Sequence, residues 1–171
     1  MHAYIARICT SFIDVPDKIA ASIYFSGCSI RCKDCQNKEL WDRNSGTKTS
    51  LEDVLKKIEE HPLAEAVVFL GGEPTEQIDF LITFCETLTT KEKVLYTGRE
   101  FEDLPKTLTA NLDLIICGPY KSELHVGGWP ASSNQRIFKK EGKTWIHQNT
   151  STDTHKTFKN YISKPIQKSF S

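Results

Sequence analysis

Continuous apolar runs recur along this chain, and they constrain its fold more than any other feature. Val67-Val68-Phe69-Leu70 and Leu114-Ile115-Ile116 contain no polar residue, so each run predicts a strand that is buried on both faces. Apolar or alternating patterns extend this prediction to a set of strands. The predicted strands cover residues 3–9, 18–25, 66–70, 94–97 and 112–117.

Helical signals lie between these predicted strands. Thr49 with Glu52 and Ser50 with Asp53 form two overlapping capping boxes, which predict the start of a helix. A second helix is predicted over 75–88, because its apolar residues recur at helical spacing. Strands that alternate with helices are typical of parallel βαβ units.

The length of the chain restricts the number of these units. Its 171 residues fall short of the roughly 250 that a complete eight-unit barrel takes. We therefore expect an α/β fold, a partial (incomplete) TIM-like barrel of parallel strands with helices outside. A C-terminal hairpin is predicted around Lys140-Glu141-Gly142, with Gly142 supplying a positive φ. Residues 1–147 are expected to form a single domain, followed by a basic polar tail at 148–171.

Charge and cysteine usage exclude several classes of protein. The 22 basic side chains balance 22 acidic ones, so neither a nucleic-acid partner nor a membrane partner is expected. The N-terminus lacks the pattern of a secretory leader, and no apolar run approaches the roughly 18 residues of a membrane span. Three of the six cysteines crowd into residues 28–35, which favours metal ligation over disulfides. A cytoplasmic location is therefore expected.

The crowded cysteines, Cys28, Cys32 and Cys35, form a loop directly after a predicted strand. Structural zinc sites and cubane iron–sulfur clusters usually take four protein ligands, so three thiolates leave one metal position open. An open position on a redox-active cluster is a place where a small molecule can bind and receive an electron. A zinc site completed by Cys9 or His61 is the alternative.

The next predicted strand ends in Gly71-Gly72-Glu73-Pro74. Two successive glycines let the backbone approach a ligand closely, and their exposed N–H and C=O groups can bind a zwitterionic amino-acid moiety. A tight strand-to-helix turn is the alternative interpretation of the same residues. The carboxyl ends of parallel strands are where sites assemble in α/β folds, so the cysteines and the glycines are expected to meet.

The order of these two motifs resembles the radical S-adenosylmethionine superfamily, whose cluster motif is Cys-x3-Cys-x2-Cys and whose next strand commonly ends in Gly-Gly-Glu or Gly-Gly-Asp. The resemblance implies one [4Fe–4S] cluster per chain, held by Cys28, Cys32 and Cys35. It further implies that S-adenosylmethionine chelates the unique iron through its amino and carboxyl groups. One-electron reduction would then cleave the sulfonium to methionine and a 5′-deoxyadenosyl radical.

A narrower resemblance covers roughly residues 5 to 140 and is to the activases of anaerobic ribonucleotide reductases. The residues that carry it are Phe25-Ser26-Gly27-Cys28, Gln36-Asn37-Lys38-Glu39-Leu40-Trp41, Tyr96-Thr97-Gly98, Asp113-Leu114-Ile115, Gly118-Pro119-Tyr120 and Ser132-Ser133-Asn134-Gln135-Arg136. It implies an oxidoreductase that generates a glycyl radical on a large reductase subunit. A one-electron donor such as flavodoxin or ferredoxin is the second implied partner.

The same resemblance implies which residues contact the cofactor. Gly71, Gly72 and Glu73 would contact its methionine end, and backbone around Asp34 and Gln36 would contact the adenine. Outer contacts are implied for Thr97, Ser133 and Asn134, whose alternatives are a turn at Thr97-Gly98 and a loop cap at Ser133-Asn134. No catalytic side chain is implied beyond the cluster-bound cofactor. Trp41, together with Leu40, is expected to pack as a lid over the cluster.

Three positions depart from the family pattern. Asp34 stands where the superfamily often has an aromatic residue, Val15-Pro16-Asp17 stands where related activases often show Asp-Gly-Pro-Gly, and Cys117 stands where Asp is expected. These departures weaken the expectation of a reductase partner more than they weaken the expected cofactor chemistry. The alternative functions are therefore a radical enzyme acting on another glycyl-radical enzyme or a peptide, and, from another class, a non-catalytic zinc-binding module.

Overall fold

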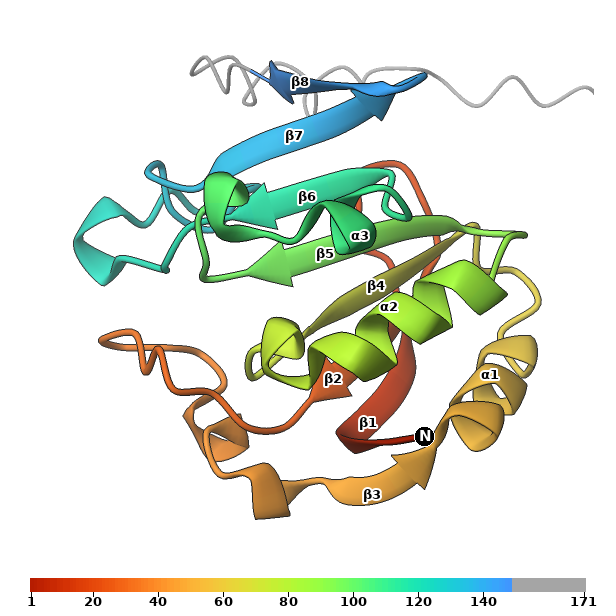
Figure 1. Ribbon diagram of the computed structural model, residues 1–171. Helices are drawn as coiled ribbons and strands as arrows, with labels where there is room; N and C mark the ends of the chain where they lie inside the picture. The colour runs from red at the N-terminus through yellow and green to blue at the C-terminus, as the bar shows by residue number, and fades with distance from the viewer. Residues whose placement is uncertain (149–171) are drawn as a thin grey trace, which may run out of the picture.

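The computed structural model describes residues 1–148, which form one open sheet of eight strands with helices on one face (Figure 1). The strand order across the sheet is β3-β1-β2-β4-β5-β6-β7-β8. The strands are β1 (His2–Ser11), β2 (Ala20–Phe25), β3 (Thr47–Ser50), β4 (Ala66–Gly71), β5 (Glu92–Thr97), β6 (Leu114–Cys117), β7 (Arg136–Glu141) and β8 (Thr144–Gln148). The α-helices are α1 (Leu51–Glu59), α2 (Ile78–Thr87) and α3 (Lys106–Thr109). The predicted basic tail lies, after Gln148, outside the described residues.

The sheet is mixed, whereas parallel strands were predicted for all of it except the C-terminal hairpin. Parallel pairing is confined to β2, β4, β5 and β6, and β1, β3, β7 and β8 pair antiparallel with their neighbours. The connections explain the difference, because a parallel pair needs a crossover of about a dozen residues or more. Residues 12–19 join β1 to β2 without a helix. The predicted C-terminal hairpin is confirmed, and Gly142 in its turn has a φ of 60°.

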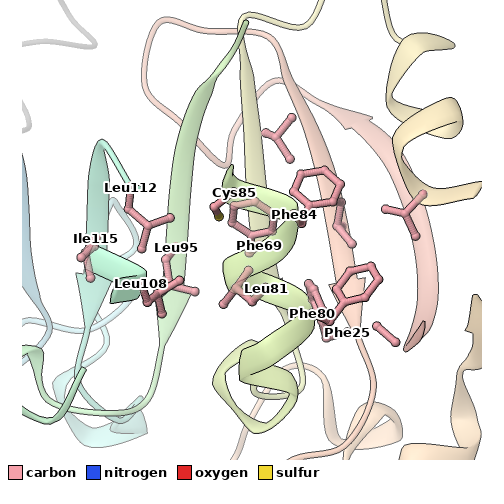
Figure 2. Close-up of a cluster of buried hydrophobic side chains, with 14 of the residues drawn as sticks. Phe25, Phe69, Phe80, Leu81, Phe84, Cys85, Leu95, Leu108, Leu112 and Ile115 are labelled. Atoms are coloured by element: carbon pink, nitrogen blue, oxygen red, sulfur yellow. The ribbon is translucent and has the colours of Figure 1, made fainter. Parts of the chain in front are cut away.

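Helices α1, α2 and α3 cover one face of the sheet, and an aromatic cluster fills the space beneath them (Figure 2). Phe80 and Phe84 on α2 pack against Phe25 and Phe69 on the sheet, and the Phe69 and Phe84 rings meet edge to face with centroids 5.4 Å apart. Ser50 caps α1 by accepting a hydrogen bond from the Asp53 N–H, as its capping box predicts. The predicted helix at 75–88 begins instead with a 3-10 turn, Pro74–Gln77.

Loops cover the opposite face of the parallel strands. Val15, from the connection between β1 and β2, packs there on a second apolar cluster together with Tyr96 and Trp129. The Tyr96 hydroxyl donates to the Asp14 carbonyl over 2.6 Å and accepts a hydrogen bond from the Trp129 indole N–H. Burial raises the pKa of Tyr96. Within residues 1–148, no helix has both the length and the apolar character needed to cross a bilayer.

The parallel strands all end at the same edge of the sheet, which positions the site. The cysteine loop follows β2, the Gly71-Gly72 turn follows β4, and a long connection at 118–135 follows β6. Figure 1 shows the segments after β2 and β6 projecting from this edge. The topology of the sheet therefore places these segments at one edge, as expected from the sequence.

Candidate cluster and cofactor site

The cysteine loop is anchored at its base by backbone hydrogen bonds to the segment that follows it. The N–H of Gly27 donates to the Leu40 carbonyl over 2.8 Å, and the N–H of Cys28 donates to the Trp41 carbonyl over 3.1 Å. Leu40 is buried and Trp41 is half-buried. These two bonds close residues 28–39 into a compact loop at the end of β2.

Inside the loop, two residues adopt left-handed backbone conformations. Arg31 has a φ of 49° and Asp34 has a φ of 57°, and the N–H of Cys35 donates to the Cys32 carbonyl over 3.2 Å. Successive tight turns bring the backbone of a short segment round on itself, so three cysteines can face a common ligand from one loop. The backbone of this loop thus folds back on itself, which allows the three cysteines to approach one another as an extended strand would not.

All three thiols are free and half-buried. Burial raises the pKa of Cys28 and of Cys32, and the Glu73 carboxylate raises both further. A thiolate here is therefore disfavoured until a metal cation compensates the charge. As the side chains lie, no three His, Cys, Asp or Glu residues within residues 1–148 are grouped to hold a single metal ion.

The residues considered as a fourth zinc ligand lie elsewhere. Cys9 pairs opposite Ser22 in the β1–β2 ladder, several residues before the end of β2. His61 precedes β4, and its Nδ1 hydrogen-bonds to the Thr10 hydroxyl over 2.8 Å. Both positions are toward the opposite edge of the parallel strands. Three thiols on one loop, with no fourth protein ligand in the described part of the chain, fit an iron–sulfur cluster with one open iron.

The Gly71-Gly72 turn is locked to the start of the cysteine loop. The N–H of Gly72 donates to the Phe25 carbonyl and the N–H of Glu73 donates to the Gly27 carbonyl, each over 2.8 Å. A Cβ on Gly71 would lie 2.6 Å from the Phe25 carbonyl oxygen, and one on Gly72 would lie 2.4 Å from that of Gly27. The Gly72 N–H, which was expected to be exposed for a ligand, is therefore used within the fold, and the glycines are required by close packing.

Glu73 is 1% exposed, and its carboxylate is fully engaged with neutral donors. Oε1 accepts from the Thr75 N–H at 3.1 Å, the Thr75 hydroxyl at 2.6 Å and the Thr97 hydroxyl at 2.8 Å, while Oε2 accepts from the Gly98 N–H at 2.8 Å. None of the ion pairs among residues 1–148 involves Glu73. The side chain ties the ends of β4 and β5 together and places an uncompensated negative charge beside the cysteines.

Thr97, a predicted outer contact, is thus brought to Glu73, with its hydroxyl donating to the carboxylate. The adjacent Gly98 touches the cysteine loop, because a Cβ there would lie 2.6 Å from Ile30 Cδ1. Reasoning from the sequence missed Ile30, which packs the loop against the end of β5. Its neighbours in the sequence are polar, so only its position between two of the cysteines could have singled it out.

Asp34 and Gln36, the predicted adenine contacts, are both exposed on the cysteine loop. The Ser122 hydroxyl donates to Asp34 Oδ2 over 2.9 Å and joins this loop to the connection at 118–135. A hydrogen bond from the Tyr120 backbone also lowers the pKa of Cys32, partly opposing its burial. No sequence signal predicts these contacts, because they join residues 88 positions apart.

Ser133 and Asn134 lie where the connection at 118–135 approaches β7. The Ser133 side chain is exposed, and its N–H donates to the Leu124 carbonyl over 2.9 Å. The Asn134 amide donates to the Pro119 carbonyl over 2.8 Å, but its Oδ1 is buried with no partner among the described residues. Such an acceptor is costly unless a donor satisfies it. Asn134 therefore has an acceptor without a donor, as expected of a residue that contacts a ligand.

Comparison with known proteins adds to this geometry. Residues 19–138 match the family described as 4Fe-4S single cluster domain. The chain belongs to this family. The cysteines of the loop at 28–35 lie within the matched residues.

Relatives of the chain include activating proteins. It is 26% identical over 136 residues to the anaerobic ribonucleoside-triphosphate reductase-activating protein of Enterobacteria phage T4, covering 73% of this chain and 86% of that one. It is 34% identical over 67 residues to the pyruvate formate-lyase-activating enzyme of Listeria monocytogenes, covering 36% of this chain but 27% of that enzyme. The crystal structure of QueE from Escherichia coli aligns with a TM-score of 0.48 at 19% identity over 57% of this chain and 53% of that one.

The family and the named relatives confirm the recognition made from the sequence. The chain is a radical S-adenosylmethionine protein of the activating-enzyme type. The positions of the cofactor contacts remain predictions, and so does the protein that receives the radical.

Proposed function

We propose that this protein is an activase that uses S-adenosylmethionine and a [4Fe–4S] cluster on Cys28, Cys32 and Cys35 to generate a glycyl radical on an anaerobic ribonucleotide reductase. The observation that carries the proposal is the set of three thiols with no fourth protein ligand among residues 1–148, beside the buried Glu73, which forms no ion pair there. When bound, the cluster supplies one electron for cleaving the sulfonium and so provides the radical that takes hydrogen from the partner's glycine.

The chain's own residues would bind and orient the cofactor. The turn at Gly71, Gly72 and Glu73 is hydrogen-bonded to the base of the cysteine loop, so a methionine moiety seated there would lie next to the thiols. The Glu73 charge attracts a cation, and S-adenosylmethionine carries both an ammonium and a sulfonium. Because neutral donors hold the carboxylate, it stays in place when no cofactor is bound.

The outer contacts would recognise the nucleoside part. Asn134 Oδ1 offers a buried acceptor for a hydroxyl or amino donor, and Ser133 lies beside it. Asp34 and Gln36 would present backbone to the adenine, and Thr97, whose hydroxyl holds Glu73, would be an outer contact of the ligand. The open sheet would serve as an incomplete barrel whose carboxyl edge surrounds the cofactor.

The partner is proposed from relatives and from the small size of the chain. The phage T4 relative, of which this chain covers 86%, is a reductase-activating protein. Leu124 and Val126 are exposed on the connection that borders the cysteine loop, where a protein substrate would close the site. A flavodoxin-like or ferredoxin-like donor would supply the electron, and a reducing cytoplasm would keep the thiols free.

A second candidate is activation of another glycyl-radical enzyme. The local identity to pyruvate formate-lyase-activating enzymes favours it, because 34% of 67 aligned residues are identical. The two candidates share the cofactor site and differ only in the protein that docks.

The test is electron paramagnetic resonance of reduced, reconstituted protein mixed with S-adenosylmethionine and an anaerobic reductase. We expect a glycine-centred doublet, and we expect Cys28→Ser, Cys32→Ser and Cys35→Ser each to abolish it. Cys9→Ser is the matched control and should retain the signal, since Cys9 lies in the β1–β2 ladder. Cofactor cleavage without a doublet on the reductase would reject that partner, and a doublet on pyruvate formate-lyase would select the second candidate.

A further inference from the structure

Trp41 carries a polar group that nothing in the described part of the chain satisfies. Its indole Nε1 is buried, with less than 1 Å² exposed, and has no hydrogen-bond partner among residues 1–148. An indole N–H is a donor only, so it cannot be satisfied by another donor. Buried donors in native proteins are nearly always paired, so an unpaired one needs an explanation.

The position of Trp41 restricts which atoms can accept a hydrogen bond from its indole N–H. Its carbonyl accepts the Cys28 N–H over 3.1 Å, and the Arg31 guanidinium lies 6.0 Å from the centre of its ring. The backbone of Trp41 is therefore joined to the first cysteine, and its indole lies near Arg31, the residue that precedes the second cysteine. The acceptors that the proposed cluster would add beside this loop are sulfurs.

We propose that the Trp41 indole N–H donates a hydrogen bond to a sulfur of the bound cluster and thereby raises its reduction potential. This inference rests on the proposed function for the presence of the cluster. A reduced cluster carries more negative charge on its sulfurs than an oxidised one, so a donor stabilises the reduced state more. Hydrogen bonds to the sulfurs are among the features that set the potential of iron–sulfur clusters.

Two other tryptophans provide internal comparisons. Trp129 has its N–H satisfied by the Tyr96 hydroxyl on the far face of the sheet. Trp145, on β8, packs with Phe101, and their ring centres are 5.7 Å apart. Neither is joined to the base of the cysteine loop by a backbone hydrogen bond, as Trp41 is, so any coupling between tryptophan and cluster should come from Trp41 alone.

The first experiment needs no variant. Full-length protein labelled with ¹⁵N at the tryptophan indole is reconstituted anaerobically, reduced, and examined by hyperfine sublevel correlation spectroscopy. We expect a ¹⁵N coupling to the cluster electron spin. A spectrum without ¹⁵N coupling, recorded on protein that holds about four irons per chain and cleaves S-adenosylmethionine, would overturn the Trp41 proposal and leave the proposed function standing.

Trp41→Phe keeps an aromatic ring and removes the N–H. We expect it to abolish the ¹⁵N coupling and to make reduction about tenfold less favourable, which lowers the midpoint potential by about 59 mV in a redox titration. Trp129→Phe is the control and should leave both readings unchanged. A coupling that persists in Trp41→Phe would also overturn the proposal. Protein that binds no iron at all would instead contradict the proposed function, which iron analysis of the same sample reveals.

Discussion

The turn after β4 and the connection after β6 border the same cysteine loop, but they differ in how completely their polar groups are satisfied. In the turn, Glu73 is buried and accepts hydrogen bonds from Thr75, Thr97 and Gly98. In the connection, Asn134 leaves a buried oxygen without a partner among the described residues. The buried carboxylate of the turn is thus fully hydrogen-bonded, whereas the buried oxygen of Asn134 in the connection still needs a donor.

This difference separates two tasks that a cofactor site needs. A satisfied buried network is rigid and fixes the position of a charge before the ligand arrives. An unsatisfied acceptor costs stability in the free protein and recovers it on binding. We therefore expect changes in the turn to affect mainly folding, and changes in the connection to affect mainly affinity for the cofactor.

The largest effect is expected for Glu73→Gln, which replaces a carboxylate oxygen by an amide donor that must face the N–H of Thr75 or the N–H of Gly98. Two donors then oppose each other in a buried place, and we expect a loss of about 3 kcal/mol in the free energy of unfolding. Chemical denaturation of the cofactor-free protein measures it. Glu76→Gln is the control, because among residues 1–148 that exposed side chain bonds only to Ser29. A cost below about 1 kcal/mol for Glu73→Gln would break the contrast between the turn and the connection.

Gly72→Ala should destabilise the protein by about 2 kcal/mol, since its Cβ would lie 2.4 Å from the backbone oxygen of Gly27, which cannot move cheaply. Gly98→Ala is the matched variant. Its Cβ would lie 2.6 Å from Ile30 Cδ1, at the end of a flexible side chain, and 3.5 Å or more from every other atom outside its neighbours in the chain, so a smaller cost is expected. Equal midpoints for the two variants in a urea titration would show that the turn is less rigid than its hydrogen bonds imply.

Asn134→Ala should change the stability of the cofactor-free protein by less than about 1 kcal/mol, because losing the bond to Pro119 is offset by removing the unsatisfied oxygen. Affinity for S-adenosylmethionine should fall about tenfold, the equivalent of about 1.4 kcal/mol. Equilibrium binding to reconstituted protein measures this. Asn111→Ala removes a similar amide that donates to Thr107 and should leave affinity unchanged. An unaltered affinity for Asn134→Ala would remove this residue from the site.

The smallest effect concerns the end of the connection, where Arg136 binds Glu100 and Glu102. Its guanidinium lowers the pKa of Glu102 from 4.5 to about 2. Because the folded pKa lies below the ordinary value, this contribution to stability is present above about pH 4.5 and is lost as the pH falls toward 2. Arg136→Gln should return the pKa of Glu102 toward 4.5 in an NMR titration of its side-chain carbons. A Glu102 pKa that stays near 2 in Arg136→Gln would show that the hydrogen bond from the backbone, and not Arg136, lowers it.

The sequence predicts the parts of this site that local patterns encode. Apolar runs identified the parallel strands, and the spacing of Cys28, Cys32 and Cys35 predicts the cluster loop. Contacts between distant segments, such as Ser122 with Asp34, were not predictable because no local pattern specifies them. The antiparallel placement of β1 was missed for a similar reason, since pairing direction depends on the connection rather than on the strand's own residues. The Gly72 N–H is bonded to the Phe25 carbonyl, so a glycine motif in the sequence does not reveal which of its N–H groups remain free to bind a ligand.

The most direct test of the central claim is the electron paramagnetic resonance spectrum of the reduced, reconstituted protein, recorded with and without S-adenosylmethionine alongside iron and sulfide analysis. Three thiols with one open iron predict about four irons and four sulfides per chain and a cluster signal that shifts when the cofactor binds. A colourless protein with one zinc per chain, or a cluster signal that S-adenosylmethionine leaves unchanged, would contradict it.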